Sequence, residues 1–460
     1  MEGLEVSEVS FLELVKASNY LRFDSEYYSK DNQAVENQLK KLDCKEIKHI
    51  AVVADGDHSK FPDNQPQEIR YLQAKDIKNH FIEYYNPVYV GKEYFEKNKR
   101  SHIVEENVIL SIMGSVGDIA IIPRGFLPCI ANRAIAIIRN IKFVSPYYLF
   151  TFLCSKFGLQ QIEKQKNGGV QERINLDLLG KIEIPILSID FQQQIENTVK
   201  LAYSKREQSQ TLYRQAEELL LETIGLKDFT PSQEKVNVKS FKESFLGTGR
   251  LDAEYYQPKY EEIINVVKNY KNGFANFESF IDSYSTGYPY KSETYIEENG
   301  IPLVRINNLT KEGLDLSNAI QIPKEDLNLS KKDIAKENDI LISMSGTIGL
   351  SCIVREKNKI VINQRIMKIT SKNYNPQVLS LLLNSIVGKY QLDRIGTGGV
   401  QTNISSSDIK NIVIPIIESE AQQQISALIQ ESFALRKESE RLLIEAKEMV
   451  EREIEKCNNN

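Results

Sequence analysis

Two long stretches of the chain, 188–232 and 418–460, repeat small and apolar residues every seven positions. A heptad pattern that lasts about four repeats predicts coiled-coil helices, and rows of small residues let two helices approach closely. The companion row of the first helix begins with Thr198 and Lys205, so we expect this helix to need the leucines of the second. The predicted helix-pair interface consists of Ile195, Ala202, Leu212, Ala216, Leu219, Ile425, Leu428, Leu435, Leu442 and Met449.

The residues between the heptad stretches form short β-rich runs. Examples from the first half are VILSIMG, IAIIP, AIAIIR and KIEIPI, which are separated by Gly, Pro and Asn. An apolar helical stretch begins at Pro146, and a similar one begins at Pro376. This pattern predicts mixed α/β domains over 42–187 and 233–417, the second with a lead-in segment. Residues 1–41 form a separate N-terminal segment.

The same passages occur twice in the same order. Residues 167–186 read NGGVQERINLDLLGKIEIPI and residues 397–416 read TGGVQTNISSSDIKNIVIPI, with nine of twenty positions identical. DSEYY begins at Asp24 and DAEYY at Asp252. A repeat this long is not a solenoid, so the chain consists of two homologous halves. The predicted fold class is α+β, with two homologous domains separated by a pair of long helices.

The helices can be arranged in two ways. If they pack antiparallel, each spans roughly 50 Å and the domains lie at opposite ends of a rod. Alternatively, the coil joins two copies of the chain. The heptad pattern alone leaves both arrangements open.

Composition is typical of a folded protein of more than one domain. The 460 residues are 41% hydrophobic and 26% charged, and the start lacks the pattern of a signal peptide. The five cysteines form no CxxC pair, which favours reduced thiols and a cytoplasmic location without a membrane span. The net charge of −5 neither favours nor excludes a nucleic-acid partner, because the acidic residues concentrate in the helical stretches.

Glycine-rich turns and polar inserts are the candidate binding residues. The turns GSVG at 114–117 and GTIG at 346–349 can offer backbone N–H groups to phosphate, or can be plain tight turns. Arg, Lys, Gln and Asn hold phosphates or read base edges, although ordinary drift of surface loops also produces divergent polar inserts. The candidate DNA-binding residues are Gln73, Lys75, Gly114, Ser115, Gly117, Arg133, Lys166, Gly168, Gly169, Gln171, Arg173, Arg305, Asn307, Asn308, Gly346, Thr347, Gly349, Gln364, Arg365, Gly398, Gly399, Gln401 and Asn403.

Catalytic patterns are weak. NPVY at 86–89 is similar to the tetrapeptide that holds a flipped base in adenine methyltransferases, but Val88 replaces the second proline. All four histidines lie in the first half, so chemistry common to both halves cannot depend on histidine. The stretch DGDHSKFPDNQ from Asp55 fits a polar turn better than a cation site. We therefore expect no catalytic residue and no metal in this chain.

The duplicated pattern resembles the specificity subunit of type I restriction–modification systems. The resemblance rests on the GGVQ…IxIPI passages, the DxEYY segments, and the QQQI that opens each long helix. It departs from the family where each long helix starts: Glu-Gln is usual there, and this chain has Gln192-Gln193-Gln194 and Gln422-Gln423-Gln424. The resemblance covers nearly the whole chain.

The resemblance implies that each domain reads half of a split, asymmetric DNA site, with the antiparallel helices as a ruler between them. It implies that residues 1–41 pack with the helical region. Two methyltransferase subunits, and possibly restriction subunits, would supply catalysis, with S-adenosylmethionine, ATP and Mg²⁺ bound on those partners. Two other hypotheses remain at this point: a two-headed structural protein that dimerises through its coil, and an enzyme that uses the Asn86 loop.

Overall fold

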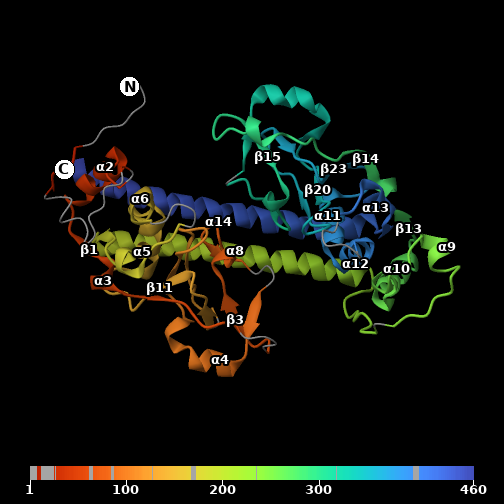
Figure 1. Ribbon diagram of the computed structural model, residues 1–460, viewed down its shortest axis with the longest axis horizontal. Coiled ribbons are helices and arrows are strands. Elements are labelled where there is room, and N and C mark those ends of the chain that lie inside the picture. The colour runs from red at the N-terminus through yellow and green to blue at the C-terminus, as the bar shows by residue number, and fades with distance from the viewer. Residues whose placement is uncertain are drawn as a thin grey trace. The chain divides into compact units, whose positions relative to one another are not determined.

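The computed structural model divides the chain into two compact units (Figure 1). Unit 1 comprises Met1–Glu207 and Arg436–Asn460, and unit 2 comprises Gln208–Leu435. The division falls inside both long helices, α8 (Ile189–Thr223) and α14 (Ser419–Asn459), so each unit holds a part of each helix. The structure describes residues 8–11, 25, 27–61, 66–83, 87–126, 128–166, 172–234, 236–317, 319–396 and 403–459.

Sheets in unit 1 combine one parallel strand pair with antiparallel neighbours. One sheet has the order β6-β3-β10-β7, in which β3 and β10 are parallel, and another has the antiparallel order β2-β11-β8-β9. The pairs β4-β5 and β1-β12 are also antiparallel. The strands are β1 (Cys44–Glu46), β2 (Val52–Asp55), β3 (Ile69–Leu72), β4 (Ile77–Lys78), β5 (Phe81–Ile82), β6 (Val88–Val90), β7 (His102–Ile103), β8 (Val108–Ser111), β9 (Ile119–Ile121), β10 (Cys129–Ala131), β11 (Ile135–Arg139) and β12 (Glu183–Pro185).

Helices of unit 1 cover one face of the β8–β11 sheet. Tyr148 and Phe152 of α5 are fully buried in one cluster with Leu110 and Ile138 of the sheet, so burial of apolar area holds the two layers together. The N-terminal α2 packs on α6, where Gln160 Nε2 donates to Asn32 Oδ1 at 2.8 Å. The helices are α2 (Lys30–Leu39), α3 (Ile47–Ile50), α4 (Lys92–Lys97), α5 (Pro146–Cys154), α6 (Lys156–Gln165) and α7 (Leu176–Leu179), with 3₁₀ turns η1 (Ala74–Asp76) and η2 (Lys99–Ser101).

Unit 2 repeats this topology. Its sheets have the orders β18-β15-β22-β19, with β15 and β22 parallel, and β14-β23-β20-β21. The strands are β13 (Phe274–Asn276), β14 (Ile281–Ser285), β15 (Ile301–Val304), β16 (Leu309–Thr310), β17 (Gly313–Leu314), β18 (Gln321–Ile322), β19 (Ile334–Ala335), β20 (Ile340–Ser343), β21 (Ser351–Ile353), β22 (Ile360–Ile362), β23 (Ile366–Ser371) and β24 (Val413–Pro415). The α-helices are α9 (Phe245–Thr248), α10 (Pro258–Lys268), α11 (Pro376–Asn384), α12 (Ile386–Ile395) and α13 (Ser406–Asn411).

The matching strand orders confirm the predicted duplication. The runs VILS of β8 and ILIS of β20 are buried at every position, as expected for central strands covered on both faces. The segments before these strands differ: the α-helix α4 lies between β6 and β7 in unit 1, whereas the 3₁₀ turn η7 (Lys324–Leu329) lies between β18 and β19 in unit 2. The other 3₁₀ turns of unit 2 are η3 (Ala253–Tyr256), η4 (Phe277–Phe280), η5 (Ser292–Thr294), η6 (Ile306–Asn308) and η8 (Lys331–Asp333).

Parts of α8 and α14 pack against each other in each unit. In unit 1 the buried Ser439 hydroxyl donates to the Ala202 carbonyl oxygen at 2.6 Å, and in unit 2 Ser432 donates to the Ser209 carbonyl oxygen at 2.7 Å. In unit 1, Ala202 lies near the C-terminal end of the α8 part and Ser439 near the N-terminal end of the α14 part. In unit 2 the two ends are exchanged, so in each unit the two helix parts run antiparallel. The small-residue row therefore brings the two backbones together.

The second buried row lies one position later than expected. In unit 1 it includes Val199, Arg206, Leu443 and Val450. A residue four positions after the small-residue row lies on the same helix face about as well as one three positions after it. The globular domain packs on this side of both helices and buries the later row. Among the predicted interface residues, Ile195, Ala202, Ala216, Ile425 and Leu442 are buried, whereas Leu212, Leu219, Leu428, Leu435 and Met449 are half-buried.

Helix α8 ends at Thr223, before the expected limit of 232. Gly225 has φ of +75°, the left-handed conformation that commonly closes a helix. In the sequence, Gly225 follows soon after the last leucines of the heptad stretch and indicates this helix end. None of the helices in the described part of the chain has the length and apolar character to cross a membrane.

Candidate nucleic-acid interface

The parallel strands β3 and β10 carry polar residues at their carboxyl ends. Leu72 ends β3 and accepts a hydrogen bond at 2.9 Å from the backbone N–H of Asn132, which follows β10. This bond places Gln73 beside the Asn132–Arg133 turn. Because parallel strands end at the same side of a sheet, three of the candidate residues, Gln73, Lys75 and Arg133, lie on one edge.

A short 3₁₀ turn fixes the first of these residues. The Asp76 carboxylate accepts from the Gln73 backbone N–H at 2.9 Å, while the Asp76 N–H donates to the Gln73 carbonyl oxygen at 2.9 Å. Asp76 is buried, Gln73 is half-buried and Lys75 is exposed. This reciprocal capping orders the backbone and leaves the Lys75 side chain in solvent.

The glycine turn of unit 1 adjoins the same edge. Ile112 donates its N–H to the Ala134 carbonyl oxygen at 2.8 Å, and Met113 forms an isolated bridge with Arg173. In the turn, Gly114 and Gly117 have φ of +84° and +102°, which explains both glycines. We call the exposed or half-buried residues gathered here edge 1: Gln73, Lys75, Gly114, Ser115, Gly117, Arg133 and Arg173.

Unit 2 builds an equivalent edge. The Val304 carbonyl oxygen at the end of β15 accepts from the Asn363 N–H at 2.9 Å, and the Asn308 side chain accepts from the Arg305 N–H at 2.8 Å. Met344 donates to the Arg365 carbonyl oxygen at 2.9 Å, and Asn403 bridges to Ser345. We call the exposed residues gathered here edge 2: Arg305, Asn307, Gly346, Thr347, Gln364, Arg365 and Asn403.

The glycine turns use some of their own N–H groups. Gly117 donates to the Ser111 carbonyl oxygen at 3.0 Å, and Gly349 donates to the Ser343 carbonyl oxygen at 2.9 Å. The Ser111 hydroxyl bonds the Ser115 carbonyl oxygen in the same turn. The turns are therefore tight and internally bonded, and they contribute to the edges through position more than as a phosphate cradle.

Several candidates have other surroundings. Asn308 is buried and its amide holds the η6 turn, as Asp76 holds η1, and Gly349 is buried against Leu392. Lys166 pairs with Glu163 at 2.6 Å and with Glu172 at 3.1 Å, so its charge is largely compensated. These three residues fit structural roles. The remaining candidates lie outside the described residues: Gly168, Gly169, Gln171, Gly398, Gly399 and Gln401.

Sequence reasoning missed a buried carboxylate at edge 1. Asp57 follows the close crossing of Gly56 over the Asn132 carbonyl oxygen, and its N–H donates to Ala131 at 2.7 Å. The Tyr94 hydroxyl donates to Asp57, and burial together with this carboxylate raises the pKa of Tyr94 to about 12. Asp57 is 5% exposed, so it supports edge 1 as a buried hydrogen-bonding residue and not as a surface group. The GD pair of the sequence was the available clue.

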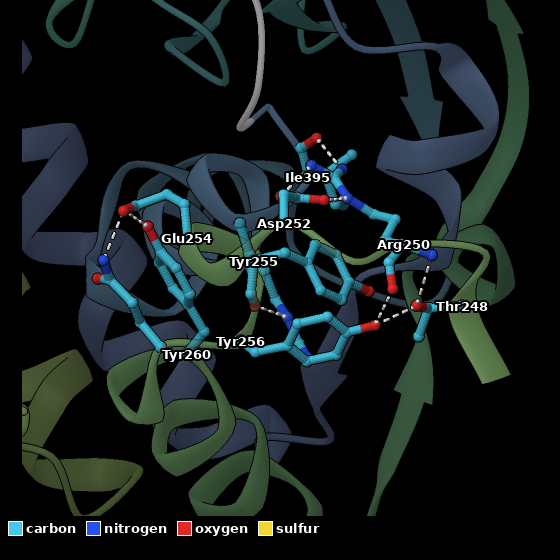
Figure 2. A network of polar contacts seen from close by, with 10 residues as sticks. Thr248, Arg250, Asp252, Glu254, Tyr255, Tyr256, Tyr260 and Ile395 are labelled. Atoms are coloured by element: carbon cyan, nitrogen blue, oxygen red, sulfur yellow. Dashed lines mark hydrogen bonds and ion pairs between the residues drawn. The ribbon is translucent and has the colours of Figure 1, made fainter. Parts of the chain in front are cut away.

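Figure 2 shows what the second DxEYY segment does. Arg250 pairs with Asp252 at 2.7 Å and donates to the Ile395 carbonyl oxygen at 3.0 Å. The Tyr255 ring lies 4.6 Å from the Arg250 guanidinium and 4.3 Å from that of Arg394. The network therefore ties the lead-in segment to the end of α12 through charge and cation–π contacts.

The first half has a related contact. Lys164, near the end of α6, lies 4.1 Å from the Tyr27 ring and pairs with Glu36 of α2. Tyr27 occupies in DSEYY the place that Tyr255 occupies in DAEYY. The DxEYY segments thus anchor the helix that precedes each GGVQ passage.

The residues weighed for catalysis or metal binding have other contacts where the structure describes them. Within the described residues no group of three or more His, Cys, Asp or Glu could hold a metal ion. Asp55 pairs with Arg100 at 2.7 Å and with His58 at 2.5 Å. Burial and nearby Lys447 lower the pKa of His80 to about 4, so this histidine is neutral near pH 7. Asn86 lies outside the described residues.

The fold and its two edges define a duplicated scaffold with two polar, basic surfaces that differ in residue identity. The profile of the family described as "Type I restriction modification DNA specificity domain" matches residues 41–212 and 274–446. The chain belongs to this family, which confirms the resemblance drawn from the sequence. The two matched regions correspond to the two homologous halves.

Individual relatives give the same family. The chain is 29% identical over 140 residues to the type I restriction enzyme EcoBI specificity subunit of Escherichia coli, a match that covers 30% of this chain and 29% of that protein. The S subunit of a type I restriction–modification system from M. genitalium is 13% identical, with 88% of this chain and 94% of that chain covered and a TM-score of 0.40. The HsdS subunit from Thermoanaerobacter tengcongensis is 14% identical, with 89% and 95% covered and a TM-score of 0.29. At these TM-scores the two structures add nothing to the fold described above.

Proposed function

We propose that this chain is the sequence reader of a type I restriction–modification complex and that each edge contacts one half of a split DNA site. The observation that carries the proposal is the recurrence of a basic, amide-bearing edge at the carboxyl ends of the parallel strands in both units. Arginine recognises guanine, and glutamine or asparagine recognises adenine, through pairs of hydrogen bonds in the major groove. Exposed Lys and Arg also neutralise phosphates.

The target is an asymmetric pair of half-sites. Edge 1 presents Gln73, Lys75 and Arg133, whereas edge 2 presents Arg305 and Gln364 at comparable places. Different side chains offer different donors and acceptors, so the same fold selects different bases in each half. A two-headed structural protein that ignores DNA has no comparable support, because it gives no reason for arginine and amide residues at both edges.

Catalysis belongs to partner chains in this proposal. Methyltransferase subunits, two in number by the symmetry of the halves, would bind S-adenosylmethionine and methylate the site. Restriction subunits would use ATP and Mg²⁺. The support is the family itself, whose description names DNA specificity within type I restriction–modification. Such a complex would work in the cytoplasm, where chromosomal DNA is accessible.

The test is to co-express the chain with its neighbouring methyltransferase gene and to map methylated adenines across the host genome. We expect one split motif with two unlike halves. The double variant Gln73→Ala/Lys75→Ala should change or abolish one half, and Arg305→Ala/Asn307→Ala should change the other. Lys97→Ala removes a lysine with a 71% exposed side chain on α4 and should leave the motif intact. A palindromic motif, or a stable homodimer that ignores DNA at low salt, would refute the proposal.

A further inference from the structure

A small hairpin connects edge 1 to the long helix α8. The hairpin β4-β5 begins at Ile77, directly after the η1 turn that carries Lys75. Its turn residues Asn79 and His80 have φ of +48° and +69°, as in the tight two-residue turns that suit the strand twist. Any movement of this hairpin therefore moves the η1 turn.

Tyr203 of α8 holds the tip of the hairpin. Its hydroxyl donates to the His80 carbonyl oxygen at 2.7 Å and accepts from the Ile121 N–H, at the end of β9, at 3.3 Å. Its ring lies 5.0 Å from the Phe81 ring. Burial raises the pKa of Tyr203, so the hydroxyl remains protonated and able to donate. One hydroxyl thus joins the helix, the hairpin and the sheet.

Arg206 of α8 holds the other end of the hairpin. It forms an ion pair with Glu83, which follows β5, and the side chains of the two residues are 5% and 10% exposed. The Arg206 guanidinium also lies 5.0 Å from the Phe81 ring. Glu83 in turn donates its N–H to the Asp76 carbonyl oxygen at 2.8 Å, and Asp76 caps η1. A charged pair this well buried holds its two partners together, because separating them would leave a buried charge without compensation.

Unit 2 holds its equivalent hairpin, β16-β17, through a different tyrosine of α8. The Tyr213 hydroxyl of α8 donates to the Lys311 carbonyl oxygen, in the turn of β16-β17, at 3.3 Å. Asp315 occupies the place of Glu83, with its N–H donating to the Asn308 carbonyl oxygen at 2.8 Å, but its carboxylate accepts from the Ser317 hydroxyl at 2.6 Å. The residue at the place of Glu83 is therefore an aspartate that bonds a serine two positions later in the chain.

We infer that Tyr203 and Arg206 are positioning residues for base reading by unit 1, because they hold the hairpin β4-β5, and through it Gln73 and Lys75 of edge 1, against α8. The inference rests on the proposed function, since it requires edge 1 to contact DNA. It adds residues that touch no DNA yet determine how accurately edge 1 discriminates bases.

The experiment uses the full chain co-expressed with its methyltransferase partner and a plasmid library in which every base of each half-site is replaced singly. The readout is the ratio of methylation at the cognate site to methylation at each substituted site. Tyr203→Phe keeps the ring and removes both hydroxyl bonds. Glu83→Gln keeps the shape and removes the buried charge pair. Tyr213→Phe is the matched control in unit 2.

For Tyr203→Phe and Glu83→Gln we expect discrimination in the half-site of unit 1 to fall by at least about threefold, because a single lost hydrogen bond already corresponds to about threefold to tenfold. Methylation of the cognate site and discrimination in the other half-site should change less than about twofold. Tyr213→Phe should leave the half-site of unit 1 unchanged. An equal loss of activity on every site would mean a merely structural role and would overturn the inference.

Gln73→Ala separates this inference from the proposed function. If Gln73→Ala alters base preference in one half-site while Tyr203→Phe and Glu83→Gln alter neither, edge 1 reads DNA and the positioning role is wrong. If Gln73→Ala and Lys75→Ala also leave both half-sites unchanged, edge 1 does not read DNA, and the proposed function of this edge fails together with the inference.

Discussion

Gln192, the first glutamine of the QQQI at the start of α8, should be essential for the stability of unit 1. It is 4% exposed. Its Oε1 accepts from the Ser145 N–H at 2.8 Å, and its Nε2 donates to the Leu187 carbonyl oxygen at 2.9 Å. Replacing it by leucine keeps a similar size and helix propensity but leaves both backbone groups without this partner.

The expected loss follows from these two bonds. A buried polar group that loses its partner costs about 1–3 kcal/mol, and Ser145 is only partly buried, so Gln192→Leu should lower the free energy of unfolding by about 2–4 kcal/mol. For a domain of this size, each kcal/mol corresponds to a fall in Tm of about 2–4 °C. The neighbouring Gln193 is exposed and bonds Asn197 at 3.1 Å, so Gln193→Leu should change the free energy by less than about 0.5 kcal/mol.

Scanning calorimetry of the purified chain would check this, with Gln193→Leu as the matched control in the same helical turn. The two units are expected to give separate transitions, and Gln192→Leu should shift the transition of unit 1. In unit 2, Gln422 makes the same two contacts, with Asn375 and Ile417 at 2.8 Å each, so Gln422→Leu should shift the other transition. Equal effects of Gln192→Leu and Gln193→Leu would refute the reasoning.

Three further outcomes are expected. The pKa of His80 is lowered from 6.5 to about 4. The contribution of neutral His80 to stability is therefore complete above pH 6.5 and is lost as the pH falls through 4. In urea unfolding curves, His80→Asn should remove up to ~3 kcal/mol of this pH dependence. Gly56→Ala would put a Cβ 2.0 Å from the Asn132 carbonyl oxygen and should destabilise unit 1 by about 1–3 kcal/mol. Gly180→Ala should cost less, because the nearest neighbour of its Cβ is a side-chain atom at 3.3 Å. Thermal melts of the two variants would show the difference. Ser439→Val removes the bond to Ala202 at a fully buried position and should destabilise the helix pair by a similar amount, whereas the exposed Lys437→Ala should not, again by calorimetry.

Part of the candidate site could be predicted from the sequence, because its members are polar residue types that occur at or near turns present in both halves. Lys75 and Arg305 belong to the divergent polar inserts, and Arg133 and Gln364 were also candidates; all four are exposed at the edges. Asn308 was selected for the same reason but is buried as a cap. Sequence reasoning could not separate Asn307 from Asn308, because the difference depends on which amide faces the turn.

The sequence by itself determined the duplication, the two mixed domains and the two long helices, because repeats and heptads are properties of neighbouring residues along the chain. The tertiary structure decided which polar residues meet, because β3 pairs with β10 across a long stretch of chain. It also decided the second buried row of α8, in which Arg206 lies among apolar residues. An arginine at that position is stable since Glu83, distant in sequence, compensates its charge, and no local pattern contains that partner.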